Sequence, residues 1–144
     1  MRLVFLPFII VAADYASKRY IKSVMTEGMS VPVIDGVFHI TYVLNPGAAF
    51  GLLPNQRALF VAAAVALLAL LLGLRKHIKK QPPCILAGAG LIAGGALGNL
   101  IDRINTGEVV DFLDFRVWPV FNVADAAICI GAGCILWNMM KNKK

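Results

Sequence analysis

The stretch VVDFLDFRVWPVFNVAD, from Val109 to Asp125, decides how this chain is organised. It carries three aspartates, Asp111, Asp114 and Asp125, among residues that are otherwise largely apolar. A run without charge, AAICIGAGCILWNMM, follows Asp125 and ends at Met140. Because a carboxylate is costly to keep at the mouth of a membrane-length apolar segment, Asp125 is a candidate for a functional site. We expect Asp111 and Asp125 to meet at a membrane surface and to work as a pair.

The composition of the whole chain is that of a polytopic membrane protein. Of its 144 residues, 59% are hydrophobic and 15% are charged, and the mean hydropathy is +0.75. A soluble domain is usually about half apolar and about a quarter charged. The apolar residues fall in blocks of membrane-span length. The length suits a single integral-membrane domain, residues 1–144.

Four apolar segments predict four membrane-spanning helices, so the expected fold class is a mainly α membrane protein. Val11-Ala12-Ala13 in the first segment also resembles a signal-peptide cleavage site, but we prefer an uncleaved span. The third segment holds glycines at positions 90, 94 and 98, a spacing that lets helices pack backbone to backbone. We expect the spans at about 3–21, 58–74, 84–101 and 120–140.

The basic residues predict the orientation of these spans. The side that holds both termini and the basic RKHIKK loop, residues 75–80, has eight Lys or Arg and no acid. The other side has all eight acids and six Lys or Arg. Because cytoplasmic loops are enriched in Lys and Arg, we expect both termini in the cytoplasm and the carboxylates at the outer face. The net charge of +6 therefore reflects topology, and no nucleic-acid partner is expected.

The segment between the first two spans predicts a small β-hairpin. Val31 to Ile34 and Val37 to Leu44 read as strands, and Asp35-Gly36 between them is a typical tight turn. The segment NPGAAFG, residues 45–51, follows directly. Its proline and two glycines predict a bent backbone, and its small side chains would let another group approach closely. A plain turn is the alternative interpretation of this segment.

Two carboxylates at one membrane face predict an acid–base site. Close carboxylates share a proton, because both cannot ionise cheaply side by side. The ionised one can remove a proton from water while the neutral one polarises a carbonyl, which is aspartyl-protease chemistry. Asp111 and Asp125 are the candidates because their neighbours are apolar. Asp114 is not a candidate, because in an extended segment it points to the face opposite Asp111. Other acids are expected in solvated outer loops: Glu27, Asp35 and Glu108.

Other chemistries find less support. The sequence has no HExxH motif for zinc and no GxSxG elbow, and the adjacent Ser17 and Lys18 would point apart on a helix. It has no dense acidic cluster of the kind that binds Mg²⁺ or Ca²⁺, so neither a metal nor a cofactor is expected. The three cysteines include no CxxC pair and are expected to act as small buried hydrophobic residues.

Two other functions stay open at this point. A small proton-coupled transporter would use Asp14 and Asp125 as proton carriers. Transporter sites usually lie near the membrane midplane between internal repeats, whereas here the acids gather toward one face and the sequence has no internal repeat. An enzyme that acts on lipid phosphates would use Arg103 and Lys18. We favour the peptidase.

Five motifs follow one another along the chain: DYASK at 14–18, NPGAAFG at 45–51, GGALGNLIDR at 94–103, VVDF at 109–112 and FNVADAA at 121–127. Together they resemble the motifs of one family, signal peptidase II, the bacterial lipoprotein signal peptidases. They lie in the expected order, at suitable spacing, over nearly the whole chain, with no departure at the motif positions. The resemblance implies an aspartyl endopeptidase of the bacterial cytoplasmic (inner) membrane. It would remove signal peptides from prolipoproteins just before a cysteine that carries a diacylglyceryl group.

The resemblance also implies roles for single residues and a set of partners. Asp111 and Asp125 would be the catalytic pair, at the outer face of the membrane. A small extracytoplasmic β-cradle is implied, in agreement with the predicted hairpin. The implied partners are lipid-modified prolipoproteins, membrane lipids and globomycin-type inhibitors, and a monomer is expected. The residues implied to line or brace the substrate site are Asp14, Lys18, Asn45, Asn99, Arg103 and Asn122.

Overall fold

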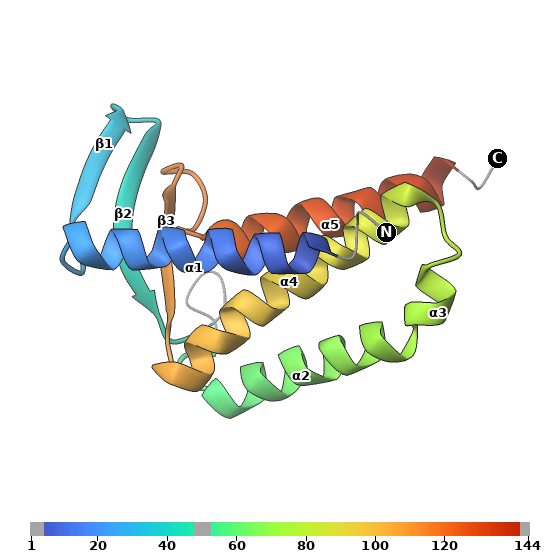
Figure 1. The fold of residues 1–144 in the computed structure, drawn as a ribbon. Helices are drawn as coiled ribbons and strands as arrows, with labels where there is room; N and C mark the ends of the chain where they lie inside the picture. Colours follow the sequence, from blue (N-terminus) through green and yellow to red (C-terminus); the bar gives the residue numbers. More distant parts are fainter. Residues whose placement is uncertain (1–4, 48–52, 142–144) are drawn as a thin grey trace.

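The fold is mainly helical, with one small antiparallel sheet (Figure 1). The structure is a computed structural model and describes residues 5–47 and 53–141. Residues 48–51 of the NPGAAFG motif and the basic residues Arg2, Lys143 and Lys144 lie outside these ranges. In chain order the elements are α1 (Leu6–Val24), β1 (Ser30–Ile34), β2 (Phe38–Asn45), α2 (Arg57–Gly73), α3 (Arg75–Ile78), α4 (Pro83–Asn105), β3 (Val109–Asp114) and α5 (Val123–Lys141).

The sheet has the strand order β1-β2-β3. β1 and β2 form the predicted hairpin, and β3 pairs with the other edge of β2 although α2 to α4 separate the two strands in the chain. Ile40 lies opposite Leu113 and Val43 lies opposite Asp111, so β2 advances by three residues while β3 advances by two. The extra residue makes a β-bulge, which increases the local twist beside Asp111.

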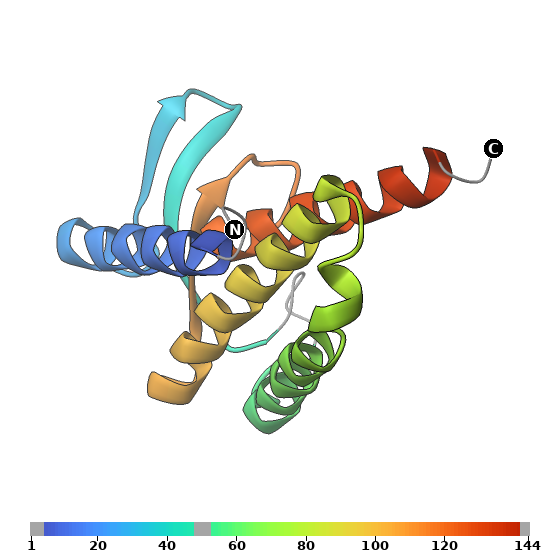
Figure 2. The same cartoon turned by 45° about the vertical axis from the view of Figure 1, so that its right-hand side comes forward.

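Helix α4 is the centre of the helical layer. It packs against α5, α1 and α2, and it is the only helix in the described ranges with extensive contacts to all three of these helices. Figures 1 and 2 show the sheet at one end of the helices, while α3, the start of α1 and the end of α5 lie at the opposite end. This arrangement brings the ends of α1 and α4, the start of α5 and strand β3 to one place.

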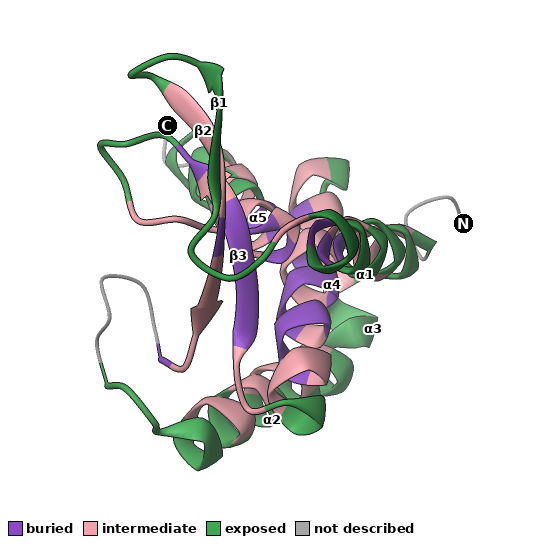
Figure 3. Ribbon diagram, turned by 90° about the vertical axis from the view of Figure 1, so that its left-hand side faces the viewer, coloured by how far each residue is buried: buried purple, intermediate pink, exposed green. Residues whose placement is uncertain are grey.

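Burial is concentrated where the sheet meets the helices (Figure 3). Ile21 of α1 packs there with Tyr42, Val110 and Phe112 of the sheet. The outer surfaces of the helices instead expose large apolar side chains, and α2 has no buried residue at all. Extended exposed apolar surface is typical of a protein that faces lipid.

Glycines let α4 approach two helices at once. A Cβ added at Gly94 would lie 2.8 Å from Cβ of Ile10 in α1, and one at Gly95 would lie 2.3 Å from the carbonyl oxygen of Ala124 in α5. Neither contact leaves room for a side chain. The predicted glycine pattern therefore marks the α1 face, whereas the α5 face uses Gly88 and Gly95, which lie outside that pattern.

Several predicted helix ends are wrong by a few residues. Helix α4 continues to Asn105, and α5 begins at Val123 instead of near 120. The later start of α5 has a structural cause, because Phe121 is held in a β-bridge to Leu113. The basic segment 75–80, expected as a loop, begins with the short helix α3.

Length and composition separate the helices that could span a membrane from those that do not meet these criteria. Within the described ranges, α4 and α5 are long and apolar enough to cross a membrane. Helix α2 is apolar but has only 17 residues. Helix α1 has 19 residues and carries charged side chains, among them Asp14 and Lys18. These criteria establish two candidate spans where the sequence predicted four.

Candidate active site

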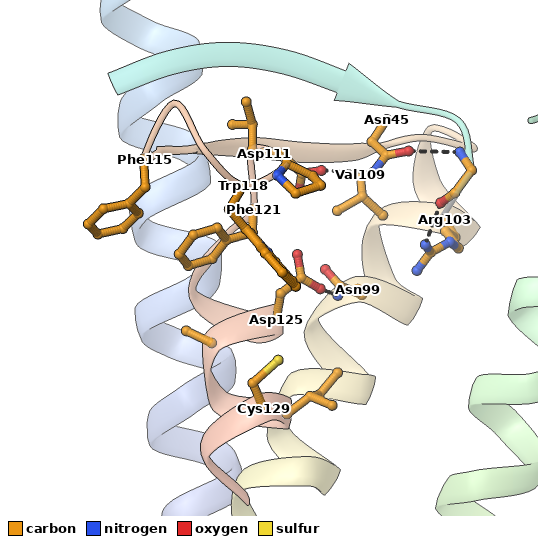
Figure 4. A pocket seen from close by; sticks show the side chains of 15 residues that line it. Asn45, Asn99, Arg103, Val109, Asp111, Phe115, Trp118, Phe121, Asp125 and Cys129 are labelled. Atoms are coloured by element: carbon orange, nitrogen blue, oxygen red, sulfur yellow. Dashed lines mark hydrogen bonds between the residues drawn. The ribbon is translucent and has the colours of Figure 1, made fainter. Parts of the chain in front are cut away.

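A cavity of about 540 Å³ lies between β3, α4 and the start of α5. Asp111 and Asp125 both line it, and Figure 4 shows their side chains at its centre. Asn45 and Arg103 lie on one side of the two aspartates, and aromatic side chains lie on the other (Figure 4). The cavity therefore joins a polar side and an apolar side at a pair of carboxyl groups.

Asp111 is held in the buried strand β3, where only 2% of the residue is exposed. Its Oδ2 accepts a hydrogen bond from Nδ2 of Asn45 at 2.9 Å, and its Oδ1 accepts one from Nδ2 of Asn122 at 2.7 Å. Desolvation by burial raises the pKa of Asp111 from 3.8 to about 7. The negative charge of Asp125 acts in the same direction, while the two amide hydrogen bonds oppose it. Asp111 can therefore hold a proton near neutral pH.

Asp125 is oriented by the first turn of α5. Its Oδ2 accepts a hydrogen bond from the backbone N–H of Asn122 at 3.3 Å, and its own backbone N–H donates to Oδ1 of Asn122 at 2.9 Å. This reciprocal pair is a capping box, which satisfies two backbone donors at a helix start. Nδ2 of Asn99 donates to Oδ1 of Asp125 at 2.7 Å. The hydrogen bonds that cap the start of α5 therefore also fix the direction of the Asp125 carboxylate.

Asn122 connects the two aspartates. Its residue is fully buried, with 0% exposed, and the same side chain that contacts Asp111 caps the turn of Asp125. Its Nδ2 also lies 3.1 Å from Oδ1 of Asn99 and 3.3 Å from the carbonyl oxygen of Val110. One amide thus sets the relative orientation of both carboxylates.

A buried ionic cluster lies behind this pair. Nζ of Lys18 is 2.7 Å from Oδ2 of Asp14 and 2.7 Å from Oδ2 of Asp102, and it donates to Oδ1 of Asn99 at 3.1 Å. The backbone N–H of Ala124 donates to Oδ1 of Asp14 at 2.9 Å. Because a carboxylate at a helix N-terminus is favourable, Asp14 ties α1 to the start of α5. Asp14 and Lys18 are not among the residues that line the cavity.

The polar side of the cavity is held by contacts to Gly47. Its backbone N–H donates to Oδ1 of Asn45 at 2.9 Å, and its carbonyl oxygen accepts from Nη2 of Arg103 at 3.1 Å. The guanidinium of Arg103 also lies over the ring of Phe60, 4.9 Å from its centroid. These groups present fixed donors and acceptors beside the two carboxyl groups.

The structure gathers all eight residues that the sequence singled out. Asn45, Asn99 and Arg103 line the cavity with the two aspartates, whereas the others brace them from behind. Asp102, one turn from Asn99 on the same helix, was expected at the same membrane face but was not named as a site residue. Sequence reasoning missed the aromatic wall of the cavity, for which no pattern in the sequence gave a signal. Within residues 5–47 and 53–141, no three His, Cys, Asp or Glu side chains gather as metal ligands.

Comparison with known proteins identifies the family. The family model described as signal peptidase (SPase) II matches residues 6–141, nearly the whole chain. This chain belongs to the signal peptidase II family. It is therefore a peptidase, which confirms the expected enzyme class, and no comparison favours the transporter.

Relatives of this signal peptidase II chain align with it over almost their full length. A lipoprotein signal peptidase of Pelotomaculum thermopropionicum is 49% identical over 140 residues, covering 94% of this chain and 91% of the relative. One of Moorella thermoacetica is 44% identical over 140 residues, covering 97% and 93%.

Two solved structures, both described as bacterial membrane enzymes determined by the in meso method, share the fold. The 2.3 Å structure has a TM-score of 0.94 at 31% identity, covering 99% of this chain and 90% of the other. The 1.9 Å structure has a TM-score of 0.88 at 32% identity, covering 97% and 93%. The mainly helical fold with its small sheet is therefore that of a bacterial membrane enzyme of the signal peptidase II family.

Proposed function

We propose that Asp111 and Asp125 are the catalytic pair with which this peptidase cuts prolipoproteins just before their diacylglyceryl-modified cysteine. The observation that carries the proposal is the pairing of two carboxyl groups through Asn122 at one cavity. The raised pKa of Asp111, about 7, supports it, because a shared-proton pair needs one member that stays neutral.

In this proposal the proton of the pair resides on Asp111 in the resting enzyme. Asp111 is almost completely buried, whereas Asp125 is only partly buried at the start of α5. Burial disfavours the charged form, so the more buried carboxyl is the better proton holder. Asp125 is then the carboxylate that accepts a proton from water.

The reaction follows from this assignment. Asp125 removes a proton from a water molecule, whose oxygen forms a bond to the carbonyl carbon of the scissile peptide. Asp111 gives its proton to the carbonyl oxygen, which yields a tetrahedral diol. Asp125 then protonates the amide nitrogen, the C–N bond breaks, and a diol hydroxyl returns its proton to Asp111. The products are the signal peptide with a free carboxyl group and the lipoprotein with a free amino group.

The polar groups around the pair position the substrate. Arg103 and Asn45 offer donors and acceptors to the peptide backbone on the polar side of the cavity. Asn99, Asn122, Asp14 and Lys18 form the brace behind the carboxyl groups. The same cavity would receive globomycin-type inhibitors. Because every proposed site residue comes from one chain, we propose a single domain, residues 1–144, that acts as a monomer.

We further propose four spans, α1, α2, α4 and α5, in the bacterial inner membrane. The charges of Asp14 and Lys18 support a spanning α1, because they are 1% and 3% exposed and paired inside the protein. The 17 residues of α2 rise about 26 Å, close to the ~30 Å hydrocarbon core. The sheet and the active site would face outward, and both termini and α3 would face the cytoplasm, as the basic residues predict.

Accessibility of single cysteines tests this topology. In a background without the three native cysteines, Asn55→Cys should react with an impermeant thiol reagent in intact cells, because it lies on the outer side. Lys79→Cys should react only after the cells are opened. Reaction at position 79 but not at position 55 in intact cells would reverse the orientation.

The catalytic pair is tested by replacing each aspartate with asparagine, which keeps the shape but cannot ionise. Asp111→Asn and Asp125→Asn should each lower the cleavage rate by about three orders of magnitude or more, and the double variant should be hardly slower. The assay is a gel-shift cleavage of a diacylglyceryl-modified precursor by purified enzyme in detergent. Asp35→Asn, an exposed acid in the β1–β2 turn, is the matched control. Wild-type turnover by either site variant would refute the pair.

Chelation tests the proposed independence from metals. If the two carboxyl groups activate water directly, cleavage should continue at the wild-type rate in EDTA. Loss of activity on chelation, restored by Zn²⁺ or Mg²⁺, would assign the reaction to the class of metal-dependent hydrolases.

A further inference from the structure

Asp114 is a buried acid that the proposed reaction does not use. Only 4% of the residue is exposed, at the end of β3. Its Oδ2 accepts a hydrogen bond from Oγ1 of Thr41 at 2.7 Å, and its Oδ1 accepts one from the backbone N–H of Arg116 at 2.9 Å. Nη1 of Arg116 lies 3.0 Å from Oδ2. Desolvation would raise the pKa of Asp114, but these bonds outweigh it and lower the pKa below 3.8.

These bonds hold the start of the segment 115–121, which connects β3 to α5. Arg116 has φ +65°, a left-handed conformation that is unfavourable for a residue with a side chain. An aspartate carboxylate that accepts the N–H two residues later stabilises such a turn. The far end of the segment is fixed by paired backbone hydrogen bonds between Leu113 and Phe121. Asp114 is therefore the side chain that determines how this segment leaves the sheet.

The segment 115–121 supplies most of the apolar side of the active-site cavity. Phe115, Trp118, Pro119, Val120 and Phe121 all line the cavity. In Figure 4, Phe115 and Phe121 lie on the side of the two aspartates away from Asn45 and Arg103. Phe115 stacks on Phe121 with ring centroids 5.9 Å apart and contacts Phe38 of β2 at 4.7 Å. Ile128 and Cys129 of α5 extend this surface one turn beyond Asp125. We name these seven residues the apolar wall: Phe115, Trp118, Pro119, Val120, Phe121, Ile128 and Cys129.

We propose that Asp114 is a positioning residue that holds the apolar wall, and that an acyl chain of the substrate's diacylglyceryl-cysteine lies on that wall. The inference rests on the proposed function. The cysteine adjoins the bond that is cut, so its lipid must lie close to Asp111 and Asp125. The apolar wall meets this requirement, since Phe121 directly precedes Asn122 and Cys129 is one helical turn from Asp125.

Hydrogen-bonding capacity favours an acyl chain over a peptide segment on this side. A peptide carries an N–H donor and a C=O acceptor at each residue and needs partners for them when it is buried. Such partners are available on the opposite side, at Asn45 and Arg103. The aromatic and aliphatic side chains of the apolar wall suit a hydrocarbon, which needs none.

The kinetic test uses precursors that carry either dipalmitoyl or dioctanoyl glycerol. Asp114→Ala should raise KM for the dipalmitoyl precursor about tenfold with kcat within about threefold, because the apolar wall binds substrate but takes no part in bond cleavage. The dioctanoyl precursor should change much less. Asp114→Asn, which keeps one acceptor for the N–H of Arg116, should have a smaller effect. Arg116→Pro removes that N–H and cannot adopt φ +65°, so it should reproduce Asp114→Ala.

The outcomes of this test are distinct. Asp35→Asn is the matched control on the same sheet and should keep both KM values. A fall in kcat at unchanged KM, an equal rise of KM for both precursors, or no change would each overturn the inference. Cleavage of both precursors at the wild-type rate by Asp111→Asn or Asp125→Asn would instead refute the proposed function.

A binding measurement covers the case in which Asp114→Ala does not fold. Trp137→Phe leaves Trp118 as the only tryptophan of the chain, and Asp125→Asn prevents cleavage. A precursor whose acyl chains carry bromine should quench the fluorescence of Trp118, because bromine quenches on contact. No quenching, equal quenching by brominated phospholipid alone, or quenching only by bromine on the signal peptide would overturn the inference.

Discussion

Two pairs of carboxylates lie side by side around Asn99, and different kinds of group contact them. In the ionic cluster, Asp14 and Asp102 share the ammonium group of Lys18. In the proposed catalytic pair, Asp111 and Asp125 are met by neutral amides and backbone groups, and neither makes an ion pair in the part of the chain that the structure describes.

The difference separates a structural role from a chemical one. In the ionic cluster, Lys18 pairs with Asp14 of its own helix and with Asp102 of α4, and Asp14 also accepts the backbone N–H of Ala124 in α5, so the cluster anchors three helices to one another. Asp111, whose side-chain hydrogen bonds come from two neutral amides, has its pKa raised to about 7 by burial and can gain or lose a proton at little cost near neutral pH. The surroundings of each aspartate therefore separate the carboxylates that anchor helices from the pair for which we propose acid–base chemistry.

The largest expected effect comes from removing the cation of the ionic cluster. Lys18→Met should lower the free energy of unfolding by about 3–5 kcal/mol, because two buried carboxylates then face each other without compensation. The measurement is thermal unfolding in detergent micelles. Lys22→Met, an exposed position on the same helix, is the control and should unfold near the wild-type temperature. Equal unfolding temperatures for the two variants would contradict the structural role of the cluster.

Asn122 is linked to both pairs of carboxylates, directly to Asp111 and through Asn99 to Lys18. Its removal should therefore affect both the stability and the cleavage rate. Asn122→Ala should lower stability by about 1–3 kcal/mol, since it leaves buried polar groups without partners. It should also lower the cleavage rate by about ten- to a hundredfold, since Asp111 and Asp125 lose their common orientation. Asn105→Ala, exposed at the end of α4, is the control. Normal turnover by Asn122→Ala would show that the pair does not need this link.

A further expected effect is a dependence on pH. Asp111 has a pKa of 3.8 in its ordinary environment and about 7 in the folded protein. Between these values the folded protein holds a proton that the unfolded chain releases, so stability should fall as pH rises through this window and level off above about pH 7. Cleavage should fall about tenfold per pH unit above about 7, as Asp111 ionises. Asp111→Asn should unfold without this dependence, and an identical dependence in wild type and variant would rule out Asp111 as its source.

The residues of the site were predictable, but part of its architecture was not. Asp111, Asp125 and the neighbouring amides stand out because polar groups are rare in apolar segments, and charge placement predicted that they share one face. The pairing of β3 with β2 could not be read from the sequence, because it joins strands that three helices separate. The same holds for the apolar wall, whose loop is shaped by Asp114 at the end of β3. Glycine spacing predicted that α4 packs closely on another helix but did not name α1 as that helix, and it missed Gly88 and Gly95, which lie outside the GxxxG pattern.

The hydrogen bond from the backbone of Ala124 to Asp14 joins the first helix to the last across 110 residues. Both members of the proposed catalytic pair come late in the chain, and Asp125 arrives only with α5. A ribosome therefore makes Asp14 and Lys18 long before Asp111 and Asp125. Under the proposed function, the growing chain has no proteolytic centre until α5 is made and docks on α1. The docking of α5 is then the activation step, so a chain that still lacks α5 cannot attack neighbouring precursors.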